Sequence, residues 1–344
     1  MSAATLRTLA RELGLSAANV SAALRGSSRV NAATAKRICQ AAAQAGYHRN
    51  PLTGAVMSEL RRSKGQVVRG VLAVLELMPA DRRSYENRFN AVLLGGIVAR
   101  AGKLGFNVER FEIGAGGHTL HSVDAVLGSR PIQGVLILPV SDPPDLSGMT
   151  WERYAALYVD YYIAHPPLHC VSPDHYRAMV ALVQELHHRG YRRPGLVMDT
   201  RMDSRLHFRW EGAFRAVQQS LYGTANAPIL LLDTPGELQF ASWFKQHDPD
   251  VVLTHFYEAL GWMVSCGAKL GETHGYVCLN SFRTKGDCAA LDLQPELLGA
   301  RATDLVISQL LNNEYGIPQH ASLTTIPARL LDGPTLYPAP PLGV

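Results

Sequence analysis

Several features that define other protein classes are scarce in this chain of 344 residues. Only five cysteines occur, at the scattered positions 39, 170, 266, 278 and 288, which argues against a disulfide framework or a cysteine-rich zinc site. We therefore expect buried free thiols and a reducing, cytoplasmic environment. No run approaches ~18 apolar residues, so we expect no transmembrane helix. The opening MSAATLRTLARELGL lacks a basic patch followed by an apolar run, so we expect no secretion signal.

Charge is sparse and unevenly distributed. Charged residues make up 18% of the chain and hydrophobic residues 47%, an ordinary globular composition long enough for two or three domains. Residues 1–64 hold ten Lys and Arg against two Glu, a net charge of +8, which leaves −4 for the remainder. A basic head on a mildly acidic body is typical of a module that binds a polyanion, and it indicates nucleic acid as a partner.

The basic head has the pattern of three short helices. Apolar residues recur at helical spacing from residue 6 to residue 13, and Gly14 then interrupts the helix. Ser16 is expected to cap a second helix that ends at Gly26, and Asn31 a third helix over 32–45. The residues expected to face inward are Val20, Leu24, Ile38, Ala42 and Ala45. A glycine-containing turn between the first two helices predicts a helix-turn-helix.

Residues 5–51 resemble the head of the lactose/galactose-repressor family of bacterial transcription regulators. The matching pieces are Thr5-Leu6, Ala10, Gly14-Leu15-Ser16, Val20-Ser21, Val30, Thr34, Gly46-Tyr47 and Asn50-Pro51. The chain departs from the usual Thr and Arg of the family at Asn19 and Ala22. The resemblance implies DNA contacts from Thr5, Leu6, Ser16, Ala17, Ala18, Asn19, Ser21, Ala22, Arg25, Arg29, Asn31, Thr34, Tyr47, Asn50, Val56 and Met57.

The second helix offers few groups that could read bases. Its outward alanines are Ala17, Ala18 and Ala22. A methyl group packs on a thymine methyl but cannot hydrogen-bond a base edge, so these alanines are either methyl contacts or simply helix formers. The residues suited to phosphates are Asn19, Ser21 and Arg25. Specificity must then come partly from elsewhere.

Residues 50–62 occupy the place of the hinge helix in the resembling proteins. The resemblance implies that this segment forms a helix in the minor groove of operator DNA, where a leucine opens a central base step. That leucine falls on Val56, with Met57 beside it, and both are apolar types that can enter a kinked step. The alternative is an ordinary solvated linker.

From residue 66 onward, strand-like and helix-like segments alternate, which predicts parallel sheets covered on both faces. The strand-like runs are 67–77, 107–113, 134–140, 154–160, 193–199, 227–233, 250–256 and 276–280, and the clearest helical runs are 90–105, 176–190 and 209–221. The predicted fold is an all-α helix-turn-helix head plus an α/β body of two doubly wound lobes. The resemblance extends over this body and implies lobes of periplasmic-binding-protein type I, joined by three crossovers.

The expected division is a head at 1–49, a hinge at 50–64 and a body at 65–344. Lobe 1 would comprise about 65–165 and 291–318, and lobe 2 about 166–290 and 319–340. The resemblance implies a homodimer formed through the body, to which helix 90–104 contributes, and an effector between the lobes. The implied effector residues are Phe89, Asn90, Ser141, Asp160, Tyr161, Asp174, Arg209, His255, Phe256 and Asn280.

Three of these positions depart from the family. His255-Phe256 replaces the usual Asn-Asp pair, and Asn280 replaces Asp.

The sequence motifs that would indicate an enzyme are weak. The run 114–119, GAGGHT, fails the third glycine of a dinucleotide loop and has no Lys-Ser/Thr for a phosphate loop. The adjacent His187 and His188 point apart on a helix and cannot share a metal. No cofactor and no metal are expected.

The sequence therefore predicts an effector-responsive DNA-binding transcription regulator, a repressor. It would bind a pseudo-palindromic operator in double-stranded DNA as a homodimer, and a carbohydrate as effector. The alternatives are a small-molecule-binding protein with a degenerate DNA-binding head and, more distantly, a sugar-processing enzyme.

Overall fold

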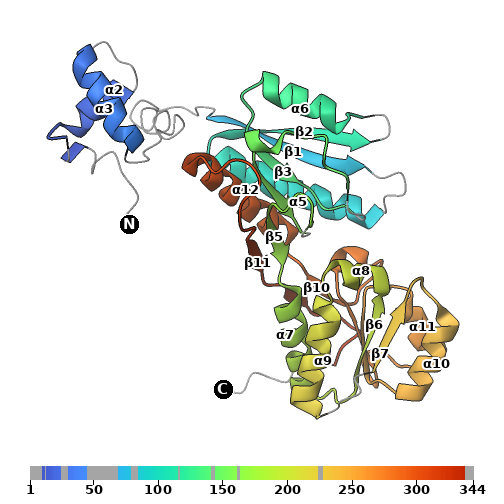
Figure 1. Cartoon of the computed structure of the whole chain (residues 1–344). Coiled ribbons are helices and arrows are strands. Elements are labelled where there is room, and N and C mark those ends of the chain that lie inside the picture. The colour runs from blue at the N-terminus through green and yellow to red at the C-terminus, as the bar shows by residue number, and fades with distance from the viewer. Residues whose placement is uncertain are drawn as a thin grey trace. The chain divides into compact units, whose positions relative to one another are not determined.

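The computed structural model of the chain describes residues 10–11, 13–24, 30–44, 69–78, 84–114, 117–140, 144–160, 163–223 and 228–337 (Figure 1). The chain divides into two compact units. One comprises residues 1–69 with 311–313, and the other comprises 70–310 with 314–344. The first unit contains the basic head and the second the α/β body, and each is described by itself.

The head contains α2 (Ala17–Leu24) and α3 (Ala32–Gln44). Both predicted caps are present. The Ser16 hydroxyl oxygen accepts a hydrogen bond from the Asn19 N–H at 3.2 Å, and the Asn31 side-chain oxygen accepts one from the Thr34 N–H at 2.8 Å. Such a bond satisfies one of the free amides of the first helical turn. The buried residues that hold the helices together are Ala10, Val20, Ala23, Ile38 and Ala42.

The body contains two six-stranded sheets. The strands of the first are β1 (Gly70–Met78), β2 (Phe106–Gly114), β3 (Gly134–Ile137), β4 (Ala155–Val159), β5 (His169–Pro173) and β11 (Leu323–Ile326), in the order β11-β5-β4-β3-β1-β2. The strands of the second are β6 (Pro194–Asp199), β7 (Ile229–Leu232), β8 (Val251–Thr254), β9 (Gly275–Cys278), β10 (Ala289–Asp292) and β12 (Arg329–Leu331), in the order β12-β10-β9-β8-β6-β7. The pairing of β12 with β10 is antiparallel, and the other strand pairs run parallel.

Helices cover both faces of the first sheet. On one face, Val123 and Leu127 of α6 (Leu120–Ser129) pack in a core cluster with alternate residues of β1. On the other face lie α5 (Ser84–Lys103) and α12 (Pro295–Asn312). These two helices approach each other closely, because a Cβ added at Gly96 or Gly299 would overlap backbone oxygens of the facing helix. Glycine is therefore required where α5 and α12 cross.

The second sheet is covered in the same way. The helices α7 (His175–His188) and α9 (Arg209–Tyr222) lie side by side on one face, and α10 (Glu237–His247) and α11 (Ala259–Ser265) cover the other (Figure 1). Aromatic residues of α10, including Phe240 and Trp243, pack against the strands there. The shorter elements are α8 (Thr200–Arg205), η1 (Trp151–Arg153) and η2 (Ser281–Arg283).

The sheet pairing differs from the predicted lobe boundaries at two points. The predicted changes of lobe at residues 166 and 319 precede β5 and β11, yet both of these strands belong to the first sheet. The reason is that β5 pairs along β4, and β11 then pairs along β5. The chain therefore leaves the first sheet only after Pro173 and again after Ile326, and it returns between β10 and α12.

All five cysteines have free thiols, as the odd number and scattered spacing predict. Their burial differs from the expectation, because Cys170 and Cys278 are buried whereas Cys39 and Cys266 are exposed. Among the helices in the described ranges, none combines the length and apolar composition needed to cross a bilayer.

Candidate functional site

Three predicted effector residues directly follow the carboxyl ends of parallel strands, and a fourth lies close behind another strand. Asp160 follows β4, Asp174 follows β5, His255 follows β8, and Asn280 lies two residues beyond β9. In doubly wound sheets this edge is where ligands bind, since the strand ends and the loops after them leave a crevice. The first two residues belong to the first sheet and the other two to the second.

Asp160 is the most unusual of the four. It is buried, and its φ of 79° lies in the left-handed region that non-glycine residues rarely adopt. Its Oδ1 atom has no hydrogen-bond partner within the described part of the chain. Burial raises the pKa of Asp160 to about 7, although the Arg205 guanidinium opposes the shift. Unusual backbone geometry with an unpaired buried carboxyl is typical of a functional site.

Three aromatic rings of the second lobe form a row. The His175 ring meets the Trp210 ring edge-on at 5.0 Å between centroids, and Trp210 meets His255 in the same way at 5.6 Å. The Nδ1 atoms of both histidines and the Nε1 atom of Trp210 are buried without a partner among the described residues. Burial, reinforced by Arg209, lowers the pKa of His175 to about 3. Burial also lowers the pKa of His255 well below its usual value. Both rings are therefore neutral at pH 7.

Three arginines approach the same region. An Arg205 Nη2 donates to the backbone oxygen of Val140 at 2.9 Å, which links the second lobe to the first. Arg209 begins α9 and is close enough to act on both His175 and Cys170. Arg283 donates weakly to the backbone oxygen of His255, at 3.5 Å. Asp160 and Arg209 both act on the pKa of Cys170, so a carboxyl group of the first lobe and a guanidinium of the second lie near the same thiol.

Two further predicted effector residues, Phe89 and Asn90, lie in α5. The Phe89 ring meets the Phe282 ring of η2 edge-on, with centroids 5.5 Å apart. The Asn90 side-chain amide donates to the backbone oxygen of Pro139 at 3.3 Å. Both residues are buried. Phe89 thus contacts the second lobe, whereas Asn90 fixes the loop that follows β3.

The remaining predicted effector residues have structural contacts. Asp174 caps α7, since its Oδ1 accepts the Arg177 N–H at 3.0 Å. The Asn280 Oδ1 accepts the Phe282 N–H at 3.0 Å and so caps η2. Phe256 packs in the core of the second lobe. The residues Ser141 and Tyr161 lie outside the described residues.

Sequence reasoning missed three residues of this region, His175, Arg205 and Arg283. A signal for one of them was available, because His175 directly follows the predicted Asp174. Arg205 ends α8 and Arg209 begins α9, so their spacing of four residues does not place them on one helical face. Nothing in the sequence indicated that Arg283, far along the chain, reaches His255.

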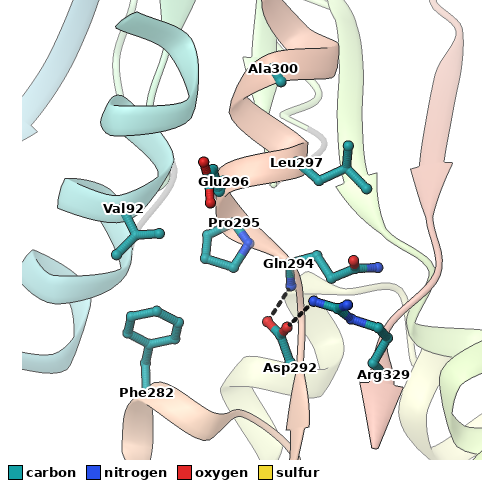
Figure 2. Close-up of a pocket in the computed structure, with 9 residues that line it drawn as sticks. All are labelled: Val92, Phe282, Asp292, Gln294, Pro295, Glu296, Leu297, Ala300 and Arg329. Carbon is teal, nitrogen blue, oxygen red and sulfur yellow. Dashed lines mark hydrogen bonds and ion pairs between the residues drawn. The ribbon is translucent and has the colours of Figure 1, made fainter. Parts of the chain in front are cut away.

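Two surface cavities are lined by described residues of the body. One, of about 360 Å³, is lined by Val92, Phe282, Asp292, Gln294, Pro295, Glu296, Leu297, Ala300 and Arg329. Figure 2 shows Arg329 and the Gln294 backbone N–H both directed at Asp292, where the chain passes from β10 to α12. The other, of about 510 Å³, is lined by Arg88, Ser281, Phe282, Thr284, Lys285 and Gly286. Neither cavity is lined by Asp160, Arg209 or His255.

The described part of the head contains half of the predicted DNA contacts. Asn19 is exposed, Ala22 and Thr34 are half-buried, and the exposed Ser16 and Asn31 serve as caps. The backbone of Ala17, Ala18 and Ser21 lies in α2. The predicted residues outside the described ranges are Thr5, Leu6, Arg25, Arg29, Tyr47, Asn50, Val56 and Met57. No cluster of three metal-ligand side chains occurs in the described ranges.

Comparison with known proteins agrees with this architecture. Residues 5–50 match the family described as bacterial regulatory proteins, lacI family. The whole chain is similar to a solved complex of the transcriptional regulator CelR with cellobiose, with TM-score 0.58, 15% identity and coverage of 96% of this chain and 99% of that one. It is also similar to the lac repressor dimer bound to operator and the anti-inducer ONPF, with TM-score 0.55, 16% identity and coverage of 98% and 100%.

A third similar structure is the transcription regulator CcpA of Lactococcus lactis, with TM-score 0.56 and 13% identity, which covers 77% of this chain and 99% of that one. No curated protein matches the chain. Identities this low show a shared fold only. The chain therefore carries a lacI-family domain at its N-terminus, on a body with the two-lobed fold of lacI-family transcription regulators. The matched family is described as bacterial regulatory proteins, and the similar structures are those of a transcriptional regulator and a repressor.

Proposed function

We propose that this protein is an effector-responsive repressor of transcription that acts in the cytoplasm as a homodimer. The proposal assigns residues 1–49 to the DNA-binding head, 50–64 to the hinge and 65–344 to the effector-binding and dimerisation body. What supports it is a capped helix pair inside a lacI-family segment, together with buried polar atoms without partners among the described residues in Asp160 of the first lobe and in His175, Trp210 and His255 of the second.

The DNA side of the proposal rests on charge and on the surface of α2. A head with a net charge of +8 would bind mainly through phosphates, so its affinity would fall steeply with salt. Asn19 is exposed on α2 and suits a phosphate contact. The alanines of α2 leave few base-reading groups, so deformation of the operator centre by Val56 and Met57 would supply the rest of the specificity.

The effector side rests on the position of the polar site. Asp160 comes from the first lobe, whereas Arg209 and His255 come from the second. A ligand that contacts both groups would favour lobe closure, since it binds the closed arrangement better than the open one. Closure would then change the spacing of the two heads in the dimer and the stability of the hinge. The similar CelR structure is a complex with cellobiose, and the similar lac repressor structure is bound to the anti-inducer ONPF, which supports a carbohydrate or related compound here.

Footprinting of the full chain on the DNA that flanks its own gene tests the proposal. We expect a protected, pseudo-palindromic site, since twofold protein symmetry imposes twofold operator symmetry. Val20→Asp should abolish protection because Val20 is fully buried in the head, and Leu238→Asp, a control on a side chain that is 85% exposed in the body, should not. Equal cleavage with and without protein would favour a small-molecule-binding protein whose head no longer recognises DNA.

A further inference from the structure

Phe282, in η2 of the second lobe, contacts α5 of the first lobe through both its ring and its backbone. The Phe89 ring meets the Phe282 ring edge-on, with centroids 5.5 Å apart. An Nη2 of Arg88 donates to the backbone oxygen of Phe282 at 2.7 Å. An edge-on ring pair and a hydrogen bond from a guanidinium both depend on direction. Together they favour one position of α5 relative to η2.

The loop that carries Phe282 is fixed on its own lobe. The Asn280 Oδ1 accepts the Phe282 N–H at 3.0 Å, and the Asn280 backbone oxygen accepts the Arg283 N–H at 2.9 Å. Further along the loop, the Lys285 ammonium lies over the Tyr257 ring, 5.9 Å from its centroid. The second lobe therefore holds the Phe282 ring in place independently of the first lobe.

The helix on the other side of the contact is fixed as well. An added Cβ at Gly96 or Gly299 would overlap the facing backbone, so α5 and α12 are in close contact where they cross. The Arg100 Nε also donates to Asp304 of α12 at 2.5 Å. Phe282 therefore joins two bodies that are each internally packed.

Open space lies on two sides of the Phe282 ring. Phe282 is half-buried, and it lines both the cavity of about 360 Å³ and the cavity of about 510 Å³. Figure 2 shows Phe282 and Val92 of α5 on one side of the smaller cavity, and Asp292 and Arg329 on the other. The contact thus lies beside the crossover from β10 to α12, and the ring can leave α5 without entering space that other atoms fill.

We propose that Phe282, Phe89 and Arg88 form a latch that holds the two lobes in the arrangement described above, against one in which α5 and η2 are apart. Asn280 is then a positioning residue, which acts on the latch by capping η2. Because lobe arrangement governs the two heads under the proposed function, the latch also sets the level of DNA binding from which an effector acts. This last step rests on the proposed function, whereas the effect on the lobes does not.

The distance between the lobes in the full chain tests the latch. Ala125 on α6 of the first lobe and Ala216 on α9 of the second are both exposed. Each is replaced by Cys and spin-labelled, and the accessible cysteines 39, 266 and 288 are replaced by Ser. Dilution with unlabelled chain removes distances between subunits, and pulsed electron paramagnetic resonance then gives the distribution of distances within one subunit.

Phe282→Ala should raise the ratio of the second lobe arrangement to the first ~10-fold, because the ring pair and its buried contact are lost. Phe89→Ala should act in the same direction, and the double variant should add little, since both changes remove the same pair. Phe208→Ala is the matched control, a phenylalanine of the second lobe that is 58% exposed, and it should leave the distribution unchanged. A distribution in Phe282→Ala that equals the wild-type one overturns the proposal.

Two further variants separate the latch from a general loss of packing. Arg88→Gln changes an exposed side chain and removes only the hydrogen bond to Phe282, so it should still shift the distribution in the same direction. Asn280→Ala should also shift it, whereas Asn280→Asp keeps an acceptor for the Phe282 N–H and should restore the wild-type distances. An unchanged distribution in Arg88→Gln, or equal shifts in the two Asn280 variants, would contradict the assigned roles.

The affinity of the same full-length variants for the footprinted segment tests the link to DNA. Phe282→Ala and Arg88→Gln should change this affinity in the same direction, by several-fold, and Phe208→Ala should not. Changed distances with unchanged DNA affinity would overturn the link between latch and DNA. A wild-type chain that binds no DNA would refute the proposed function instead, and the distance measurements would still decide whether the latch exists.

Discussion

The buried carboxyl of Asp160 makes a quantitative prediction about stability and pH. Its folded-state pKa of about 7 lies above the usual 3.8, so its contribution is fully present below pH 4 and is lost as pH rises through 7. His175 behaves in the opposite way. Its folded-state pKa of about 3 lies below the usual 6.5, so its contribution is present above pH 6.5 and is lost as pH falls.

The two effects are similar in size. One pKa unit corresponds to about 1.4 kcal/mol, so between pH 8 and pH 4 each group changes the free energy of unfolding by about 3 kcal/mol, in opposite directions. Burial lowers the pKa of His255 as well, so two histidines oppose Asp160 over this range. Asp160→Asn removes the contribution that stabilises the folded protein at low pH. We therefore expect the free energy of unfolding of this variant to fall by about 3 kcal/mol more than that of the wild type between pH 8 and pH 4.

Urea denaturation at a series of pH values, followed by tryptophan fluorescence, measures this difference. Trp210, one of four tryptophans, touches His175 and His255, so part of the emission reports on this region. Asp145→Asn is the matched control, because hydrogen bonds from Ser147 lower the pKa of this fully exposed carboxyl, and its small effect should have the opposite sign. A gap between wild type and Asp160→Asn that does not vary with pH would show that the folded protein holds Asp160 ionised and paired.

Three further predictions concern packing, capping and the hinge. Gly299→Ala should destabilise the body by about 2 kcal/mol in denaturation, because the added methyl overlaps α5, whereas Gly95→Ala, in open space on α5, should be neutral or stabilising. Ser16→Ala should cost the head about 1 kcal/mol and weaken its binding to all DNA, which a gel-shift titration measures. Replacing both Val56 and Met57 with Ala should lower the ratio of operator to random-DNA affinity at one salt concentration, and a ratio at the wild-type value would exclude the hinge as a source of specificity.

Local signals in the sequence predicted the head well. A cap needs only a short polar side chain at the start of a helical pattern, so Ser16 and Asn31 could be assigned without tertiary information. The strand β4 is fully buried, and its hydrophobic run predicted a strand there, whereas Asp160 was assigned from the resemblance. Short or edge strands such as β11 and β12 were missed because their exposed residues break the hydrophobic run that marks a buried strand.

The composition of the site depended on tertiary contacts that a single sequence does not show. His175, Trp210 and His255 come from α7, from α9 and from the loop after β8, and only the packing of these elements brings the rings together. Phe256 illustrates the opposite case. It follows His255 directly but packs in the lobe core, because adjacent residues at a strand end point in opposite directions.

Sequence-specific DNA binding is the central claim, and competition between two duplexes tests it most directly. The affinity of the full chain for the footprinted segment is measured by fluorescence anisotropy against a scrambled duplex of the same composition, over a series of salt concentrations. We predict a preference of at least ~1000-fold for the footprinted segment and a steep fall of both affinities with salt. Equal affinity for the two duplexes, or none for either, would contradict the account.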